Sequence, residues 1–273
     1  MPLLYTPIQQ SYRLPGPTFR LGEPAAGNRR IELDDERDEF LREKQLSGGL
    51  WRSTDDRLRL GTRVQTWLRS AVLRDQPSLA PANGSLDDLV ANIQEDVVFM
   101  ARDAGSVAAS ARAVYVNVSF PSGWCPQCVC GKRFLSIHAP VPNADQFNGH
   151  GRKNAADLLF QDDDLVRFVW SLTPDDRLDR RLCRRISDNR PLHESFETSW
   201  AGLRRLFLRV ERQVISPIDQ DIACFFIRIY RFAVADLPAD VRERIRSSIV
   251  TMPPEVLRYK GIAEAAPQIL ALL

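Results

Sequence analysis

The sequence predicts an α+β fold in which an antiparallel sheet is flanked by helices. Three observations support this. Segments with helical spacing of apolar residues come first, alternating apolar segments follow, and helical spacing returns near the end. The 273 residues, 44% of them hydrophobic, suffice for one sizeable core. We expect a proline- and glycine-rich extended arm over residues 1–30 and a single domain over residues 31–273.

Three helices are expected in the first part of the chain. Residues 31–45 begin with acidic and end with basic side chains, which suits the helix dipole. Residues 57–73 carry apolar side chains near helical spacing. Residues 85–102 give the clearest helical pattern, because Ser85 can cap the first turn and apolar positions recur after it.

The pattern then changes to that of strands. Residues 113–120 alternate between apolar and polar positions, and residues 133–139 read as a second strand. A short apolar segment covers residues 164–172, between polar stretches. Two long alternating segments, residues 203–215 and 221–232, are joined by a connection of hairpin length. A helix over 239–250, a turn-rich segment over 253–261 and a terminal helix over 262–273 complete the expected elements.

The charge balance excludes some classes of function. With 37 basic and 35 acidic residues the net charge is +2, which gives no electrostatic case for nucleic acid or an anionic membrane. The first residues do not resemble a signal peptide, and no apolar run approaches the roughly 20 residues of a membrane-spanning helix. We therefore expect a soluble, cytoplasmic protein. Five cysteines, an odd number, argue against a disulfide framework in that compartment.

The most unusual stretch is F-P-S-G-W-C-P-Q-C-V-C-G-K-R-F-L-S-I-H-A-P-V-P. It contains Cys125, Cys128 and Cys130 in a C-x2-C-x-C cluster, followed by His138. Three thiolates and one imidazole could bind zinc. The usual second pair of ligands is missing, so free or redox-active thiols are the alternative. An iron–sulfur cluster would need a further cysteine from elsewhere in the chain.

His138 has two further interpretations. A neutral imidazole on an apolar strand beside a proline-rich turn could be an axial ligand of a metal or a haem iron. It could equally be a core or edge histidine with a hydrogen-bond partner. The cluster is not C-x-x-C-H, so covalent haem attachment is not indicated.

The two long alternating segments are unusually charged. A period of two places Arg209 and Glu211 on one face and Arg212 on the other, while Arg228 and Tyr230 share a face of the second segment. Arginines in a cavity suit carboxylates, and a glutamate on a pocket wall could hold an organic cation. The alternative is a solvated face with cross-strand ion pairs.

Taken together, six short motifs resemble the catalytic subunit of the haem-dependent oxidative N-demethylases, from about residue 31 to residue 261. In chain order they are Gln94-Glu95-Asp96, F-P-S-G-W at 120–124, I-H-A-P-V-P at 137–142, R-V-E-R-Q at 209–213, I-R-I-Y at 227–230 and Y-K-G at 259–261. Each motif is short, and their order and spacing make the resemblance specific.

The resemblance implies a PAS-like antiparallel core that binds haem b. It also implies oxidation by O2 of an N-methyl group of a small amine such as dimethylamine, with release of formaldehyde. Electrons would come from NADPH through a separate flavin/iron–sulfur reductase. By motif position, His138 would be the axial ligand of the haem iron. Glu211 and Arg228 are the expected catalytic residues, and Arg209, Arg212 and Tyr230 are expected to bind the cofactor.

The cysteine cluster departs from the family pattern, which has a polar stretch without cysteines at this point. It could be a zinc-stapled loop, a thiolate near the haem, or a chance feature. Two alternatives to the enzyme follow: a non-catalytic haem-binding sensor, and a zinc-stabilised family member without haem.

Overall fold

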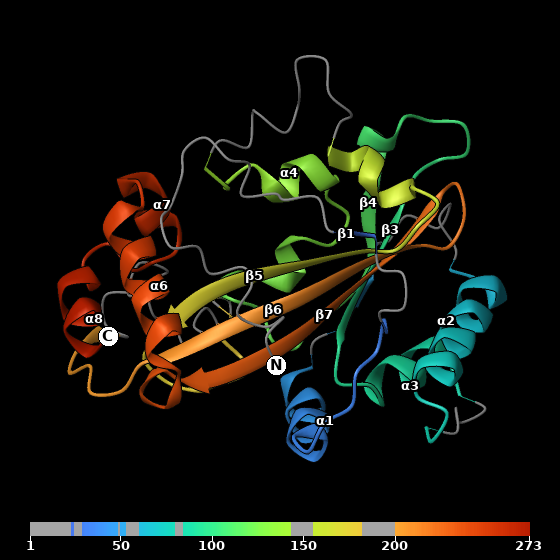
Figure 1. Ribbon diagram of the computed structural model, residues 1–273. Coiled ribbons are helices and arrows are strands. Elements are labelled where there is room, and N and C mark those ends of the chain that lie inside the picture. Colours follow the sequence, from blue (N-terminus) through green and yellow to red (C-terminus); the bar gives the residue numbers. More distant parts are fainter. Residues whose placement is uncertain are drawn as a thin grey trace, which may run out of the picture.

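The computed structural model describes residues 23–24, 29–48, 50–52, 60–79, 84–142, 155–181 and 200–273. Within these residues a seven-stranded sheet runs in the order β1-β5-β6-β7-β3-β4-β2. Figure 1 shows α4 above the sheet, α2 and α3 below its right-hand part, and α6, α7 and α8 at the end where β5 and β7 finish. The α+β class with an antiparallel sheet is therefore confirmed.

Three long strands form the centre of the sheet. They are β5 (Leu165–Thr173), β6 (Phe207–Pro217) and β7 (Ile222–Ala233), and β6 and β7 form the expected hairpin. The strand β3 (Asp96–Ala101) pairs with only the first half of β7, and β4 (Arg112–Asn117) follows it. Two short strands lie at the edges, β1 (Glu23–Pro24) beside β5 and β2 (Leu50–Arg52) beside β4.

Most of the expected helices are present with shifted ends. They are α1 (Arg37–Ser47), α2 (Thr62–Asp75), α6 (Ala239–Thr251) and α8 (Ala266–Leu272). A further short helix, α7 (Pro254–Tyr259), replaces part of the expected turn-rich segment, with Pro254 in its first turn. None of the described helices is both long enough and apolar enough to span a membrane.

The expected helix over residues 85–102 is wrong beyond its first turns. Ser85 does cap α3 (Leu86–Ala91), in a reciprocal capping box with Asp88. The helix then ends at Ala91, with Asn92 as its C-cap, and Asp96 is the first residue of β3. All six residues of β3 are buried, because β3 is a central strand with both faces covered. The sequence of such a strand is a nearly continuous apolar run without alternation. Periodicity therefore cannot distinguish it from a buried helix.

The expected strand over residues 133–139 is also wrong. Arg133 makes one isolated bridge with Arg112, after which the chain forms the short helix α4 (Phe134–His138). The apolar residues of this short segment, among them Phe134 and Ile137, fit helical spacing as well as they fit a strand. His138 therefore lies on the last turn of a helix and not on a strand.

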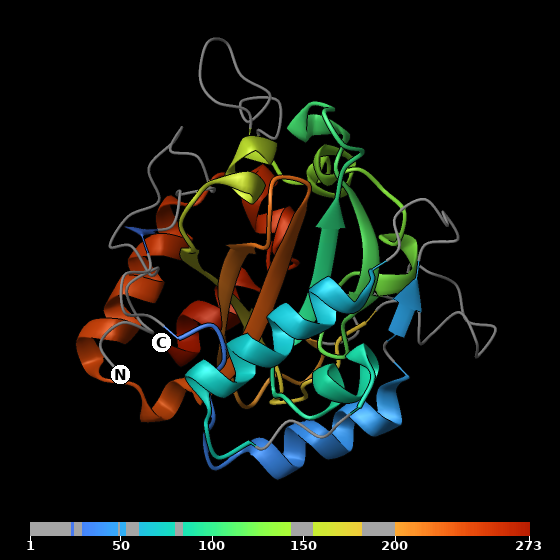
Figure 2. The same cartoon turned by 90° about the vertical axis from the view of Figure 1, so that its right-hand side faces the viewer.

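The two faces of the sheet carry different cores. We call the face with Arg209, Glu211 and Gln213 the Glu211 face, and the opposite face, with Val210 and Arg212, the Arg212 face. Part of the Arg212 face packs against α2 and α3, and the rest packs against α6 to α8. Figure 2 shows α2, in cyan, crossing in front of the strands. On the Glu211 face, apolar residues of β3 and β4 pack with α4 and with residues 155–160.

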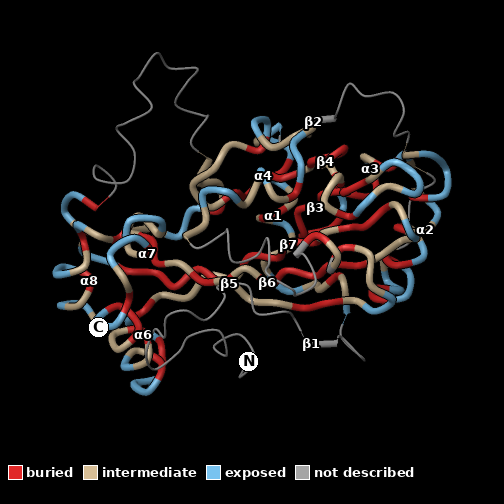
Figure 3. Tube along the Cα trace, turned by 90° about the horizontal axis from the view of Figure 1, so that it is seen from above, coloured by how far each residue is buried: buried red, intermediate tan, exposed pale blue. Residues whose placement is uncertain are grey.

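Figure 3 shows that buried residues concentrate along the strands, while exposed residues lie on the outer helices and loops. Asp96 is an ionisable exception at 0% exposure. Its two carboxylate oxygens accept hydrogen bonds from the backbone N–H groups of Ser119 and Phe120, both at 2.9 Å. Burial raises the pKa of Asp96 to about 6, against the opposing effects of Lys44 and these two bonds. Asp96 thus fixes the backbone that leads into the F-P-S-G-W motif.

We predict that Asp96→Asn lowers the free energy of unfolding by about 1–3 kcal/mol, because an amide presents one acceptor and one donor to two N–H groups. Chemical denaturation of the variant beside Asp103→Asn, at an exposed aspartate, measures the effect. Equal stability of the two variants would contradict the role given to Asp96.

Candidate functional site

Arg209 joins three separate parts of the chain on the Glu211 face. Its Nε donates to Ser122 Oγ at 2.8 Å, and its two terminal nitrogens donate to the carbonyls of Leu178 at 3.1 Å and Phe120 at 2.6 Å. The side chain is 1% exposed. The sequence predicts a cofactor-binding role for Arg209, but all three of its nitrogens already donate to this chain. In the structure Arg209 positions the F-P-S-G-W motif.

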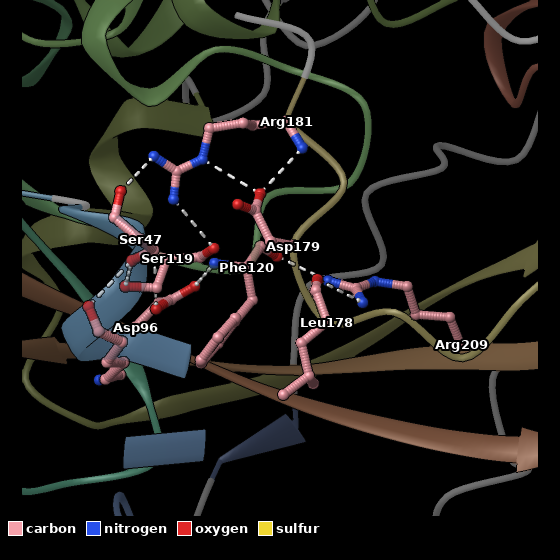
Figure 4. Close-up of polar contacts among 9 residues, drawn as sticks. Ser47, Asp96, Ser119, Phe120, Leu178, Asp179, Arg181 and Arg209 are labelled. Carbon is pink, nitrogen blue, oxygen red and sulfur yellow. Dashed lines mark hydrogen bonds and ion pairs between the residues drawn. The ribbon is translucent and has the colours of Figure 1, made fainter. Parts of the chain in front are cut away.

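The segments that Arg209 contacts are also held to one another, as Figure 4 shows. Arg181 donates to the carbonyls of Ser47 at 2.8 Å and Ser119 at 3.3 Å, and to the carboxylate of Asp179 at 3.0 Å.

Gly123 has a φ of 77°, in the left-handed region that glycine favours. This turn directs the chain away from Ser122 toward the cysteine cluster.

Glu211 lies in a chain of polar side chains on the same face. One carboxylate oxygen accepts a hydrogen bond from Ser122 Oγ, and the other accepts from Gln213 Nε2 at 2.8 Å. Gln213 in turn accepts a bond from Arg167 Nε at 2.6 Å. Ser122 is therefore shared, since it accepts from Arg209 and donates to Glu211. The chain fixes the position of the Glu211 carboxylate.

Positive charge exceeds negative charge around Glu211. Burial lowers the pKa of Arg167 and of Arg209 to about 10 in each case, so both remain charged at neutral pH. Burial lowers the pKa of Lys260 to about 8, and Glu211 acts in the opposite direction. Lys260 donates to the carbonyl of Trp170 at 2.7 Å and lies 4.6 Å from the centroid of its ring. Arg167 and Lys260 act on the one carboxylate of Glu211, whereas Arg209 also interacts with Asp96. The excess of positive charge beside Glu211 suits an additional anionic ligand.

His138 is held as a neutral imidazole with a defined tautomer. Its Nδ1 is 2.8 Å from the carbonyl oxygen of Phe134. A carbonyl can only accept, so Nδ1 carries the hydrogen and Nε2 carries the lone pair. Burial lowers the pKa of His138 to about 4, and the charge of Arg167 lowers it further. Metal-bound histidines commonly hold their ring in this way, with the other nitrogen donating to a carbonyl.

The surroundings of His138 are apolar. The Phe134 ring lies 4.3 Å from the imidazole, centroid to centroid. Several partly buried apolar side chains pack against the same core, among them Trp124, Leu135 and Ile137. A large apolar ligand with an imidazole-binding metal fits such surroundings, and its carboxylates would fit the excess of cations beside Arg167.

The other expected site residues lie on the Arg212 face. Arg212 forms an ion pair with Glu32 at 3.3 Å, and Tyr230 donates a hydrogen bond to the same carboxylate. Arg228 pairs with Asp34, and its guanidinium stacks 4.1 Å from the centroid of the Phe40 ring. These contacts hold residues 32–34, which precede α1, against the Arg212 face of the sheet. The structure therefore does not bring Arg212, Arg228 and Tyr230 together with Glu211.

The Gln94-Glu95-Asp96 motif links the two faces. Gln94 and Asp34 exchange hydrogen bonds at 2.8 and 3.1 Å, and Glu95 accepts a bond from the backbone N–H of Glu32 at 2.8 Å. Burial raises the pKa of Glu95 to about 7. The sequence pattern predicts a helix here, but the motif connects α3 to β3 and has a structural role.

The cysteine cluster forms no metal site. Across the described parts of the chain, which include Cys125, Cys128, Cys130 and His138, no group of three or more His, Cys, Asp or Glu side chains is placed to hold a metal ion. Cys125 and Cys128 begin and end one turn, and Cys130 packs against the apolar core. The proposed set of zinc ligands is therefore not assembled.

Sequence reasoning missed Arg167, Gln213 and Lys260 as parts of this site. Each carries a usable signal. Arg167 is a single charge within the apolar segment L-V-R-F-V-W, and Gln213 shares the alternation of Glu211. Lys260 lies in the Y-K-G motif, whose residues receive no functional role from the sequence analysis.

We predict that Arg209→Lys destabilises the protein by about 2–4 kcal/mol, because an ammonium cannot replace a guanidinium that donates in three directions and the buried carbonyls lose their donors. Thermal and chemical denaturation measure this loss. Arg204→Lys, at an exposed arginine on the approach to β6, is the matched control. If both variants unfold alike, Arg209 does not hold these segments together.

Comparison with known proteins adds an independent finding. A search of curated proteins gives no match. The sequence model of the family described as "Haem-dependent oxidative N-demethylase, alpha subunit-like" matches residues 58–270, a range that contains all the motifs on the Glu211 face. The match spans well over half of the chain, and it agrees with the resemblance seen in the motifs. The chain therefore belongs to the haem-dependent oxidative N-demethylase, alpha subunit-like family.

Proposed function

We propose that this protein binds haem b through His138 and oxidises an N-methyl group of a small amine with O2. The observation that carries the proposal is the convergence of motifs from distant parts of the chain on the Glu211 face. Ser122, Glu211 and Gln213 form one hydrogen-bonded chain with Arg167, and the charge of Arg167 acts on His138. When bound, the haem would supply the activation of oxygen.

His138 is the residue that would bind the haem iron. Its neutral state leaves a lone pair on Nε2, and the bond from Nδ1 to the Phe134 carbonyl orients the ring. The half-buried apolar side chains beside α4 would exclude water from the ligand. These are the properties that a haem protein uses to set the affinity and the potential of the iron.

Arg167 and Lys260 are the proposed partners of the haem propionates. Both cations act on the single carboxylate of Glu211, so a propionate group would balance the remaining positive charge. This assignment replaces Arg212, whose guanidinium pairs with Glu32 on the opposite face. A guanidinium suits a carboxylate because its planar fork can donate two parallel bonds.

Glu211 is the proposed substrate-binding residue. Each of its carboxylate oxygens has one described donor, and an ionised carboxylate can accept about four hydrogen bonds. It can therefore also bind the N–H of a protonated methylamine and receive its proton. Ser122 and Gln213 would hold the carboxylate in place while the substrate binds.

The electrons are proposed to come from NADPH through a separate flavin/iron–sulfur reductase. The family description names an alpha subunit, which supports a working complex with other components. We propose dimethylamine as the representative substrate and formaldehyde as a product.

We predict that His138→Gly abolishes the native Soret spectrum of the protein expressed with haem supply, and that added imidazole restores it. The imidazole would occupy the place of the missing side chain. Spectra of the ferric protein, and of the ferrous protein under carbon monoxide, measure both effects. His193→Gly, at another of the three histidines, is the control. A His138→Gly protein with the unchanged wild-type spectrum would remove His138 as the ligand.

We predict that Glu211→Gln keeps stoichiometric haem but weakens amine binding at least about 30-fold, since the loss of a charge-assisted contact costs about 2 kcal/mol or more. Titration of the haem spectrum with dimethylamine measures the affinity. Glu255→Gln, at an exposed glutamate of α7, is the control. Unchanged affinity in Glu211→Gln would place the amine elsewhere.

A further inference from the structure

The turn that contains Cys125 and Cys128 is a compact, anchored unit. Pro126–Cys128 forms a single 3-10 turn, and the N–H of Cys128 donates to the carbonyl of Cys125 at 3.1 Å. A bond between residues three apart closes a turn whose end Cα atoms lie within about 7 Å of each other. A disulfide needs Cα atoms about 4.4–6.8 Å apart, so this backbone is suited to one.

The two thiols leave the same short turn. Cys125 is its N-cap residue, in an extended conformation, and Cys128 is the last residue of the 3-10 segment. A hydrogen bond with the Cys125 side chain raises the pKa of the Cys128 thiol. Both cysteines are reduced in the structure, with Cys128 exposed and Cys125 partly exposed. A small reagent in solution can therefore reach the pair.

The ends of the turn are fixed to the rest of the fold. Trp124, Val129 and Cys130 pack against the apolar core on the Glu211 face. Gly131 donates its N–H to the carbonyl of Ala113 at 2.7 Å. The two thiols thus stay close without a bond between them, which gives each a high effective concentration toward the other.

Cys130 differs from the pair in two respects. It lies outside the turn, and its pKa is raised mainly by burial and not by another thiol. The reactive unit is therefore the C-P-Q-C pair rather than all three thiols. This agrees with the absence of an assembled metal site among the described residues.

We propose that Cys125 and Cys128 form a redox-active dithiol, which closes to an intramolecular disulfide by exchange with low-molecular-weight disulfides. One thiolate attacks a sulfur of the disulfide RS–SR, forming a mixed disulfide and releasing RS⁻. The second thiolate attacks the protein sulfur of that mixed disulfide and releases a second RS⁻. The protein pair loses two electrons, RS–SR gains them, and the two thiol protons pass to the released thiolates.

The test treats the folded full chain with oxidised glutathione, alkylates the remaining thiols and analyses the tryptic peptide of residues 113–132. This peptide contains all three clustered cysteines and neither Cys183 nor Cys224. We expect a peptide with one alkylated cysteine and two hydrogens fewer. The closed form should exceed the mixed glutathione disulfide at least about tenfold, because closure is intramolecular.

Two variants locate the bond. Cys130→Ser should still form the disulfide, and its peptide should contain no alkylated cysteine. Cys128→Ser should form none and should keep Cys125 and Cys130 alkylated or joined to glutathione. Persistent mixed disulfide in the wild-type chain, unreacted thiols at Cys125 and Cys128, or a bond that requires Cys130 would each overturn the proposal. Because the readout is a peptide mass, the result does not depend on haem or amine binding.

Discussion

The arrangement of the candidate site depends on the guanidinium of Arg209. It emerges from a central strand and donates to the chain before Gly123, to the chain near Leu178 and to the hydroxyl of Ser122. Without it, two buried carbonyls would lack donors, and Ser122 would lose the bond that orients it toward Glu211. Asp96 supports the same segment from strand β3, through two backbone N–H groups. A buried arginine is costly to desolvate, and here the cost is offset by three hydrogen bonds that fix residues 120–122 and Leu178 to β6.

The charged side chains of the hairpin divide between two tasks. On the Arg212 face, Arg212 and Arg228 form ion pairs with Glu32 and Asp34. These pairs hold the segment before α1 against the sheet. On the Glu211 face, Arg167 and Lys260 both interact with the carboxylate of Glu211, which has one described donor on each oxygen. The first set is balanced within the chain, whereas the second has an excess of positive charge. That excess, and not the number of arginines, distinguishes the proposed haem site.

The sequence by itself determined the fold class, the β6–β7 hairpin and the cap at Ser85. These follow from local periodicity, turn length and capping chemistry. The period of two also assigns Glu211 and Arg212 to opposite faces of the sheet, because neighbouring side chains of a strand alternate. The motifs likewise indicated the family, because their order along the chain is specific even though each is short.

Only the tertiary structure decided that β3 is a strand and α4 a helix. The apolar runs in both segments fit either period, and what surrounds them selects one. The tertiary structure also decided which motif residues share a site, because the contacts join residues that are far apart in the sequence. Ser122 and Glu211 are 89 positions apart, and Arg167 and Gln213 are 46 positions apart. The low pKa of His138 also depends on the folded chain, because burial and the charge of the distant Arg167 lower it, and no local pattern can supply that information.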